Sequence, residues 1–588
     1  MFKKIIFYLL LVLLGLALYL NPNFKTISAG IAILLFGMIM LEEGFKVFTK
    51  GPLQQILKKA TNKLYKSITA GAVVTALIQS SSLVTVITIS FISAGLISLA
   101  EGFGLIFGAN LGTTATAWLV AGFGLKIKIS ALAMPMLVFG IIFSFQKRQV
   151  LKGVGNVLAG LGFFFLGIHY MKEGFDVFKE YIDLSEYAVS GFLGVLIYTG
   201  LGILITTILQ SSSATLALIL TALSVGQIEY ENALALAIGA NVGTTITAVL
   251  GAVSSNSAGK RLALAHFIFN VTTGLVAMAF IFPLARLVNI LADLINIAST
   301  NNTLKLAMFH TIFNALGVLL MLPFIGVLEK FLLKFFKEKT EKDIDEPKYL
   351  NASVLKFSGS TISALIKESK YLYENSVFEI VTHALNIHRS DVKSDEKIKT
   401  IVKKSNIDFQ TDIEDLYYKK VKYIYGEIIK YASTAQSTLS LNSKQITAIT
   451  DIKIANRKMV EIIKDARELN KNISRVLDMD NKHLQKEYDS YRKKLTNVLR
   501  TIYLFRTDDD EKKHRVKLKK LKSEAIKKVR LSNKSIDKLI RQNLITAEMA
   551  SSLFNDYANV NDMIKKLIDV AELLYVKKDS LLDEEGNR

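Results

Sequence analysis

Two copies of the tetrapeptide Gln-Ser-Ser-Ser stand inside long apolar stretches of the chain, at residues 79–82 and 210–213. Hydrocarbon does not solvate such groups, so each side chain needs a partner in the protein, in water or in a ligand. Four successive residues point around all faces of a helix, so several converge on one ligand only at a helix break or a hairpin tip. Free backbone N–H groups and the positive end of a helix at such a tip favour an anion. The alternative is that the serines only hold packed membrane helices together.

A second repeated motif, Gly-Ala-Asn-x-Gly-Thr-Thr, follows each serine motif, at residues 108–114 and 239–245. Gly112 and Gly243 loosen the helix and let backbone oxygens face a cavity. Hard cations take carbonyl, amide and hydroxyl oxygens, which this motif supplies. We expect ion or substrate coordination here, with glycine-mediated close packing as the alternative.

Two histidines lie in apolar segments, each in the pattern His-x-x-Phe-Asn, at His266 with Asn270 and at His310 with Asn314. Each pair shares one face of a helix, and a histidine inside a membrane is a functional candidate. Polar packing between the two helices and a role in the transport pathway both remain open. The chain has no cysteine, and no acidic residue completes a ligand set, so we expect no metal site of the transition-metal type.

The repeated motifs belong to one longer internal repeat. Glu43-Gly-Phe matches Glu173-Gly-Phe at an offset of 130, and the two later motifs match at 131. Three motifs in one order over about 90 residues indicate structural repeats. We place repeat one at about 27–121 and repeat two at about 157–254. The two glutamates recur at helix ends, where interfacial anchoring or capping is expected.

The distribution of lysines predicts that the repeats are inverted. Six lysines follow the first Glu-Gly-Phe and predict a cytoplasmic segment: Lys46, Lys50, Lys58, Lys59, Lys63 and Lys66. The segment after the second copy carries five acidic residues and two lysines, and we expect it outside. The same motif then ends on opposite sides of the membrane. Lys3 and Lys4 place the N-terminus in the cytoplasm, and the lysines near residue 334 place the C-terminus there also.

This orientation predicts eight membrane crossings and two re-entrant hairpins. The crossings are expected near 5–20, 27–45, 99–121, 129–146, 153–171, 232–254, 263–284 and 304–328. The hairpins are expected at about 67–97 and 191–227, because single crossings there would put the basic loops on the wrong sides. The first segment is interpreted as a membrane helix rather than a cleaved signal peptide, since more apolar segments follow it.

Charge density divides the chain into two unlike parts. Residues 1–339 hold 24 Lys/Arg and 13 Asp/Glu, and residues 340–588 hold 48 and 38, of the 72 and 51 in the whole chain. The net charge of +21 is therefore shared almost evenly, while the density of charges rises about threefold. We predict an all-α fold, with a polytopic membrane domain at 1–338, a linker at 339–348 and a soluble helical bundle at 349–588. This division removes the need for a nucleic-acid partner.

The paired motifs resemble those of the bacterial branch of the type II sodium–phosphate cotransporter family, over about residues 25–330. That resemblance implies a symporter that imports inorganic phosphate with Na⁺ as the coupling ion and no cofactor. It implies a phosphate site made by Gln79, Ser80, Ser81, Ser82, Gln210, Ser211, Ser212 and Ser213. It places sodium sites at or beside Asn110, Thr113, Thr114, Asn241, Thr244 and Thr245.

The C-terminal part shows long helical periodicity. An apolar stripe runs through Ile452, Ala455, Met459, Ile463, Ala466, Leu469, Ile473 and Val476. About six such helices are expected, and their position and pattern resemble the PhoU-like bundles that follow many bacterial members of the family. The resemblance implies regulation by phosphate status. Acidic residues between Asp451 and Asp465 are too sparse to carry over a metal site. The basic segment 512–530 is expected to be a solvated helix face, with anionic lipid as the alternative contact and nucleic acid a distant one.

These observations lead to one functional prediction with alternatives. We expect a sodium-coupled phosphate importer in the cell inner (plasma) membrane, whose partners are phosphate, Na⁺ and the lipid bilayer. A transporter of another oxyanion or with another coupling ion, and a membrane phosphate sensor, are the alternatives. An enzyme is not expected, because the sequence has no P-loop, zinc motif or Ser/His/Asp set that the topology brings together. The oligomeric state, a homo-oligomer included, is left open.

Overall fold

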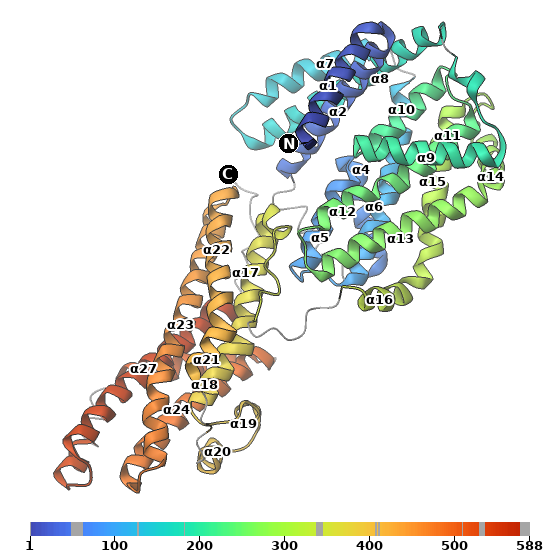
Figure 1. The fold of residues 1–588 in the computed structure, drawn as a ribbon. Helices are drawn as coiled ribbons and strands as arrows, with labels where there is room; N and C mark the ends of the chain where they lie inside the picture. The colour runs from blue at the N-terminus through green and yellow to red at the C-terminus, as the bar shows by residue number, and fades with distance from the viewer. Residues whose placement is uncertain are drawn as a thin grey trace. The chain divides into compact units, whose positions relative to one another are not determined.

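The computed structural model describes residues 2–48, 63–125, 129–181, 183–336, 345–405, 409, 412–508, 510–527 and 536–576. Within these residues the secondary structure is helical, without strands (Figure 1). Contacts divide the chain into two compact units. The first holds the described residues of Met1–Glu338, and the second holds residues 345–350 and the described residues of Val354–Glu584.

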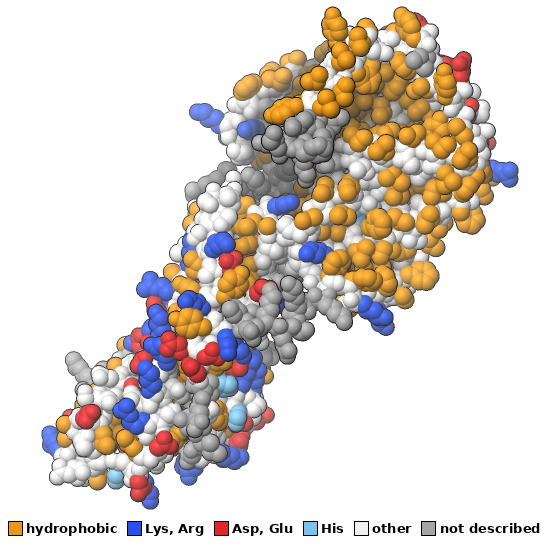
Figure 2. Space-filling model, in the orientation of Figure 1, with side chains coloured by type: hydrophobic (Ala, Val, Ile, Leu, Met, Phe, Trp, Pro, Cys, Tyr) orange, Lys and Arg blue, Asp and Glu red, His pale blue; other side chains and the backbone are white. Residues whose placement is uncertain are grey.

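The first unit consists of helices that follow the apolar segments of the sequence. They are α1 (Phe2–Leu20), α2 (Pro22–Phe48), α4 (Leu64–Ile78), α5 (Ser81–Ser93), α6 (Leu99–Leu119) with the π-helical turn η2 (Val120–Gly124), α7 (Ile129–Ser144), α8 (Gln149–Lys179), α9 (Gly191–Leu209), α10 (Ser212–Ser224), α11 (Tyr230–Gly243), α12 (Thr245–Ala252), α13 (Ser257–Ala279), α14 (Ile281–Leu294), α15 (Asn302–Met321) and α16 (Ile325–Lys334). Figure 2 shows hydrophobic side chains spread over the visible face of this unit.

Seven apolar segments among the described residues are long enough to cross a membrane: Pro22–Phe45, Leu99–Gly124, Gln149–Lys179, Gly191–Leu209, Tyr230–Ala252, Ser257–Ala279 and Asn302–Lys334. The chain is therefore a multi-pass membrane protein. Six of these segments coincide with predicted crossings. The predicted crossing at 5–20 falls on α1, and that at 129–146 falls on α7, which has 16 residues. Gly191–Leu209 was expected as one arm of a re-entrant hairpin, yet its 19 residues are long enough to span. The re-entrant course of both hairpins stays a prediction.

Helices α2 and α8, which carry the matching Glu-Gly-Phe motifs, pack closely against each other. A Cβ added at Gly30 would lie 2.6 Å from the backbone N of Met171, and one at Gly44 would lie 2.7 Å from that of Val157. Residue numbers therefore rise along α2 while they fall along α8, so the two helices are antiparallel. Equivalent helices of the two repeats thus run in opposite directions, as inverted repeats require.

The second unit is a helical bundle. Its described residues form α17 (Ser358–Leu372), α18 (Phe378–Ala384), α19 (Arg389–Lys393), α20 (Ile398–Lys404), α21 (Ile413–Tyr417), α22 (Tyr423–Thr438), α23 (Ser443–Leu477), α24 (Lys482–Thr507), α25 (Glu511–Lys527) and α27 (Ala547–Tyr575). π-Helical turns join α17 to α18 and α21 to α22. All eight residues of the predicted apolar stripe on α23 are buried. The resemblance to PhoU proteins stays a prediction, as does the linker at 339–348, of which only 345–348 are described.

Candidate functional site

Both serine motifs interrupt a helix at the same residue. Gln79 ends α4 and Gln210 ends α9, with φ, ψ angles of 60°, 26° and 53°, 23°, in the left-handed region. Non-glycine residues adopt this conformation rarely, and it stops a right-handed helix. The N–H of Gln79 still donates to the carbonyl of Thr75 over 2.8 Å, which closes the last turn of α4. The motifs therefore form helix breaks, so their side chains are no longer spread around one continuous helix.

The serine after each glutamine begins the next helix. Ser80 Oγ accepts a hydrogen bond from the N–H of Leu83, and Ser211 Oγ accepts one from that of Ala214, each over 3.2 Å. This is N-cap geometry, and it satisfies one of the unpaired N–H groups of a helix start. The remaining first-turn N–H groups and the positive helix end favour an anion at both N-termini, where α5 and α10 begin.

The first break lies part-way along a neighbouring helix. A Cβ added at Gly104 would lie 2.6 Å from Cβ of Ser67, and one at Gly112 would lie 2.8 Å from Cβ of Thr75. Residue numbers rise together, so α4 and α6 are parallel, and α4 ends two turns before η2 does. The chain then turns back through α5. This course supports the predicted hairpin, although the structure holds no membrane to define it.

Two threonines join the breaks of the two repeats. Thr116 Oγ1 donates to Gln79 Oε1 over 2.7 Å and lies 3.2 Å from Ser213 Oγ. Ser82 Oγ donates to Thr247 Oγ1 over 3.2 Å. The structure therefore brings both serine motifs into one polar cluster. Sequence reasoning missed the two threonines, although they lie at the repeat offset of 131 and extend both motifs to Gly-Thr-Thr-x-Thr.

The other threonines of the second motif bond to their own helix. Thr113 Oγ1 donates to the carbonyl of Asn110 over 2.5 Å, and Thr114 Oγ1 donates to that of Leu111 over 2.8 Å. In repeat two Thr245 likewise donates to its own helix. A hydroxyl that donates its only proton keeps its lone pairs for a cation. Asn110 is 2% exposed, and its Nδ2 has no hydrogen-bond partner among the described residues.

The asparagine of repeat two is held by the second His-x-x-Phe-Asn pair. His310 Nε2 lies 3.1 Å from Asn241 Oδ1, and Asn241 Nδ2 donates to Asn314 Oδ1 over 2.7 Å. Helix α15 therefore fixes both ends of the Asn241 amide. The pair at His266 has no such contact among the described hydrogen bonds, and Asn270 Nδ2 donates to the carbonyl of His266. The histidine helices thus do not bond to each other through these groups.

Two stretches of the first unit, residues 33–173 and 190–322, match the family model described as Na+/Pi-cotransporter. Each stretch contains one serine motif and one Asn-x-Gly-Thr-Thr motif. This part of the chain belongs to the Na⁺/Pi-cotransporter family. Members of the family are transporters rather than enzymes, as the sequence predicted.

Relatives among characterised and uncharacterised proteins agree with this assignment. YjbB of Escherichia coli strain K12, whose name proposes inorganic phosphate export, is 25% identical over 549 residues, 91% of this chain and 95% of its own. YqeW of Bacillus subtilis strain 168, named as uncharacterized, is 29% identical over 308 residues, 52% of this chain and 95% of its own. Mouse sodium-dependent phosphate transport protein 2C is 38% identical over 103 residues, 17% of this chain and 16% of its own. No solved structure matches the chain.

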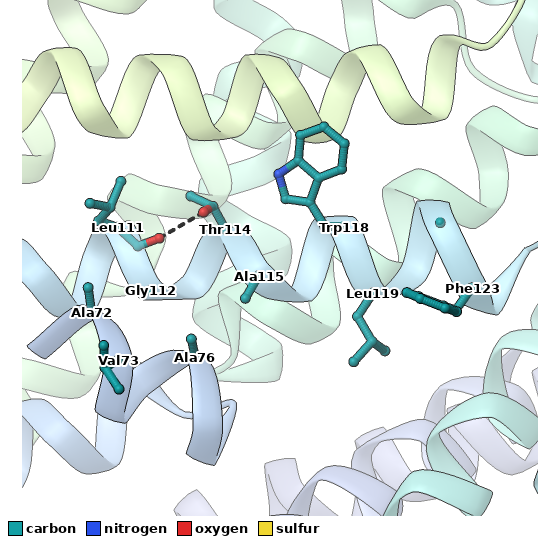
Figure 3. Close-up of a pocket in the computed structure, with 11 residues that line it drawn as sticks. Ala72, Val73, Ala76, Leu111, Gly112, Thr114, Ala115, Trp118, Leu119 and Phe123 are labelled. Carbon is teal, nitrogen blue, oxygen red and sulfur yellow. Dashed lines mark hydrogen bonds between the residues drawn. The ribbon is translucent and has the colours of Figure 1, made fainter. Parts of the chain in front are cut away.

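The cotransporter also has a pocket of about 670 Å³ between α4 and α6, shown in Figure 3. Its lining is apolar except for Thr114, whose hydroxyl is engaged by the carbonyl of Leu111. Val73 and Phe123 on its rim are more than half exposed. None of the glutamines or serines of the two motifs lines it. The pocket suits hydrocarbon rather than an oxyanion, so it is separate from the polar cluster.

In the second unit the acidic residues near Asp465 surround an ammonium group. Lys566 Nζ lies 2.7 Å from a carboxylate oxygen of Asp465 and 2.7 Å from one of Asp562. Burial raises the pKa of Asp465 despite the nearby lysine. The described residues contain no group of three or more His, Asp or Glu side chains that could hold a metal. On α25, Leu518 and Ala525 are buried and Lys522 pairs with Asp569, so this basic helix packs through one face.

Proposed function

We propose that the chain is a secondary transporter that imports inorganic phosphate together with Na⁺. The observation that carries the proposal is the position of Thr116, which bonds to Gln79 of the first motif and lies beside Ser213 of the second. Inverted repeats whose broken helices meet in this way form the substrate sites of many secondary transporters. The family match and the phosphate-transport relatives give the substrate.

Phosphate is proposed to bind between the two helix breaks. Both breaks present a helix N-terminus, and Ser81 and Ser212 are the first residues of α5 and α10. Residues 67–97 and 191–227 contain no Lys or Arg to neutralise a phosphate, which carries roughly −1.5 to −2 charges at pH 7. Bound Na⁺ would supply the missing positive charge, and this requirement would couple the two fluxes.

Sodium is proposed to bind beside the second motif of each repeat. Hydroxyl lone pairs of Thr113, Thr114 and Thr245 and the amide of Asn110 are oxygen donors of the kind that Na⁺ takes. Asn241 is engaged by α15, so in repeat two the amide would share its oxygen with His310.

Phosphate export is a second candidate, favoured by the name of YjbB, which aligns with 91% of this chain. An inward Na⁺ gradient drives a symporter inward, so export would need a different coupling or none. Flux of ³²P-phosphate in proteoliposomes of known orientation distinguishes the two. Import that stops when choline replaces Na⁺ supports the symporter, and equal uptake in choline contradicts it.

The second unit is proposed to be a PhoU-like regulatory domain, in a protein of the inner membrane with both termini in the cytoplasm. The burial of the α23 stripe in a bundle of long helices supports the likeness. Deleting residues 345–588 is expected to leave transport active but insensitive to intracellular phosphate. A deletion variant that still responds to phosphate would contradict the regulatory role.

A further inference from the structure

A carboxylate reaches the first helix break from α2. Ser80 Oγ donates to Glu42 Oε2 over 3.3 Å. Glu42 is half-buried and lies within the apolar segment Pro22–Phe45, whereas its neighbour Glu43 is exposed. An ionisable side chain inside a membrane span is costly and points to a function with a nearby partner. The partner here is the serine that begins α5.

The repeat does not require this carboxylate. At the offset of 130 that relates α2 to α8, Glu43 corresponds to Glu173, and both are exposed on their helices. Glu42 corresponds to Lys172, so the charge at this position is reversed in repeat two. A residue needed only to pack equivalent helices would not change sign. The carboxylate is therefore a specific property of the first break.

The bonds of Ser80 restrict what can bind beside Glu42. A serine hydroxyl carries one proton, and that of Ser80 is directed to Glu42 while its oxygen accepts from the N–H of Leu83. A carboxylate accepts hydrogen bonds and donates none. An oxyanion bound at this break would thus meet a negative acceptor, which repels an anion that has no proton to donate.

We infer that Glu42 makes the site selective for protonated oxyanions, by accepting a hydrogen bond from the P–OH group of phosphate and excluding sulfate. Near neutral pH inorganic phosphate keeps at least one P–OH group, whereas sulfate keeps none. Sulfate would leave the carboxylate facing a dianion without a shared proton, and specificity of this kind comes from a repulsive contact with the wrong ligand. This inference rests on the proposed function, and it assigns the chemical class of the substrate.

The test compares Glu42→Gln with the matched control Glu43→Gln in proteoliposomes that hold the full chain. Uptake of ³²P-phosphate is measured against unlabelled sulfate and against arsenate, which keeps a proton as phosphate does. In the wild-type chain and in Glu43→Gln, arsenate should compete and sulfate should not. In Glu42→Gln the sulfate concentration needed for half-inhibition should fall at least about tenfold, because the amide can donate to a dianion.

An unchanged exclusion of sulfate by Glu42→Gln would overturn the inference. If this variant carries no flux, binding of ³⁵S-sulfate to the purified chain decides instead: binding above that of the wild type supports the inference, and equal binding overturns it. Wild-type phosphate uptake that ignores Na⁺ would contradict the proposed symport alone and leave the sulfate comparison intact. The two claims therefore fail separately.

Discussion

Ser82 of the first serine motif donates a hydrogen bond to Thr247, which lies 165 residues later in the second repeat. The repeat-equivalent residues, Ser213 and Thr116, lie within the same distance of 3.2 Å. Each repeat thus supplies a threonine that contacts the helix break of the other. This reciprocal contact fixes the two helix starts relative to each other, which a ligand shared between them requires.

Removing the Thr116 hydroxyl should therefore weaken phosphate binding without unfolding the transporter. Thr116→Val keeps the shape and loses the contacts to Gln79 and Ser213, and loss of one buried hydrogen bond costs about 1–3 kcal/mol. We expect the phosphate concentration for half-maximal uptake to rise about tenfold. Thr207→Val is the control, because Thr207 is exposed and bonds only to its own helix. Equal effects of the two variants would contradict the role of Thr116.

The contact between α2 and α8 should not tolerate side chains at its glycines. A Cβ at Gly37 would lie 2.5 Å from the backbone N of Phe164, closer than real Cβ atoms approach. Gly37→Ala is expected to destabilise the first unit by about 1–3 kcal/mol, the usual effect of overpacking. Gly200→Ala on α9 is the matched control, because it meets nothing within 4 Å. Thermal unfolding in detergent measures both, and equal melting temperatures would refute the packing argument.

His310→Ala should act through Asn241. The variant removes the group next to Asn241 Oδ1 and frees the amide to rotate. We expect the Na⁺ concentration for half-maximal uptake to rise several-fold, with a smaller change for phosphate. His169→Ala is the control, because His169 is exposed on α8. A Na⁺ dependence that is the same in all three proteins would show that the histidine is only a packing residue.

Glu368 should make the second unit less stable as the pH rises. Its carboxylate is fully buried and accepts the N–H of Tyr349 over 2.6 Å, and burial raises its pKa from 4.5 to about 7. The folded state therefore binds this proton more tightly than the unfolded state. Stability is full below pH 4.5 and is lost as the pH rises through 7, by about 3 kcal/mol in total.

Hydrogen-exchange protection of the α17 amides, corrected for intrinsic exchange, measures this loss in the full chain. Glu368→Gln should remove most of the pH dependence, whereas Glu548→Gln, at an exposed position, should keep it. Protection in the wild type that stays constant from pH 5 to 8 would rule out the proposed titration.

The sequence predicted the helical architecture and located both helix breaks, because polar tetrapeptides in apolar segments leave few other solutions. It also predicted the buried stripe of α23 from its period of three and four. It did not predict that Thr116 lies beside Ser213 or that His310 holds Asn241, because such contacts depend on how helices rotate against one another. Glu42 escaped notice for a different reason: repeat comparison highlights residues that recur, and Glu42 has a lysine as its counterpart.

Phosphate flux driven by Na⁺ tests the account's central claim most directly. Proteoliposomes that hold the full chain, Ser81→Ala, Ser212→Ala or the double variant are loaded with choline and diluted into ³²P-phosphate with Na⁺ or with choline. The proposed site predicts Na⁺-dependent accumulation by the wild type and at least about tenfold slower uptake in each single variant. Accumulation that is equally fast in choline, or uptake by the double variant equal to the wild type, would contradict it.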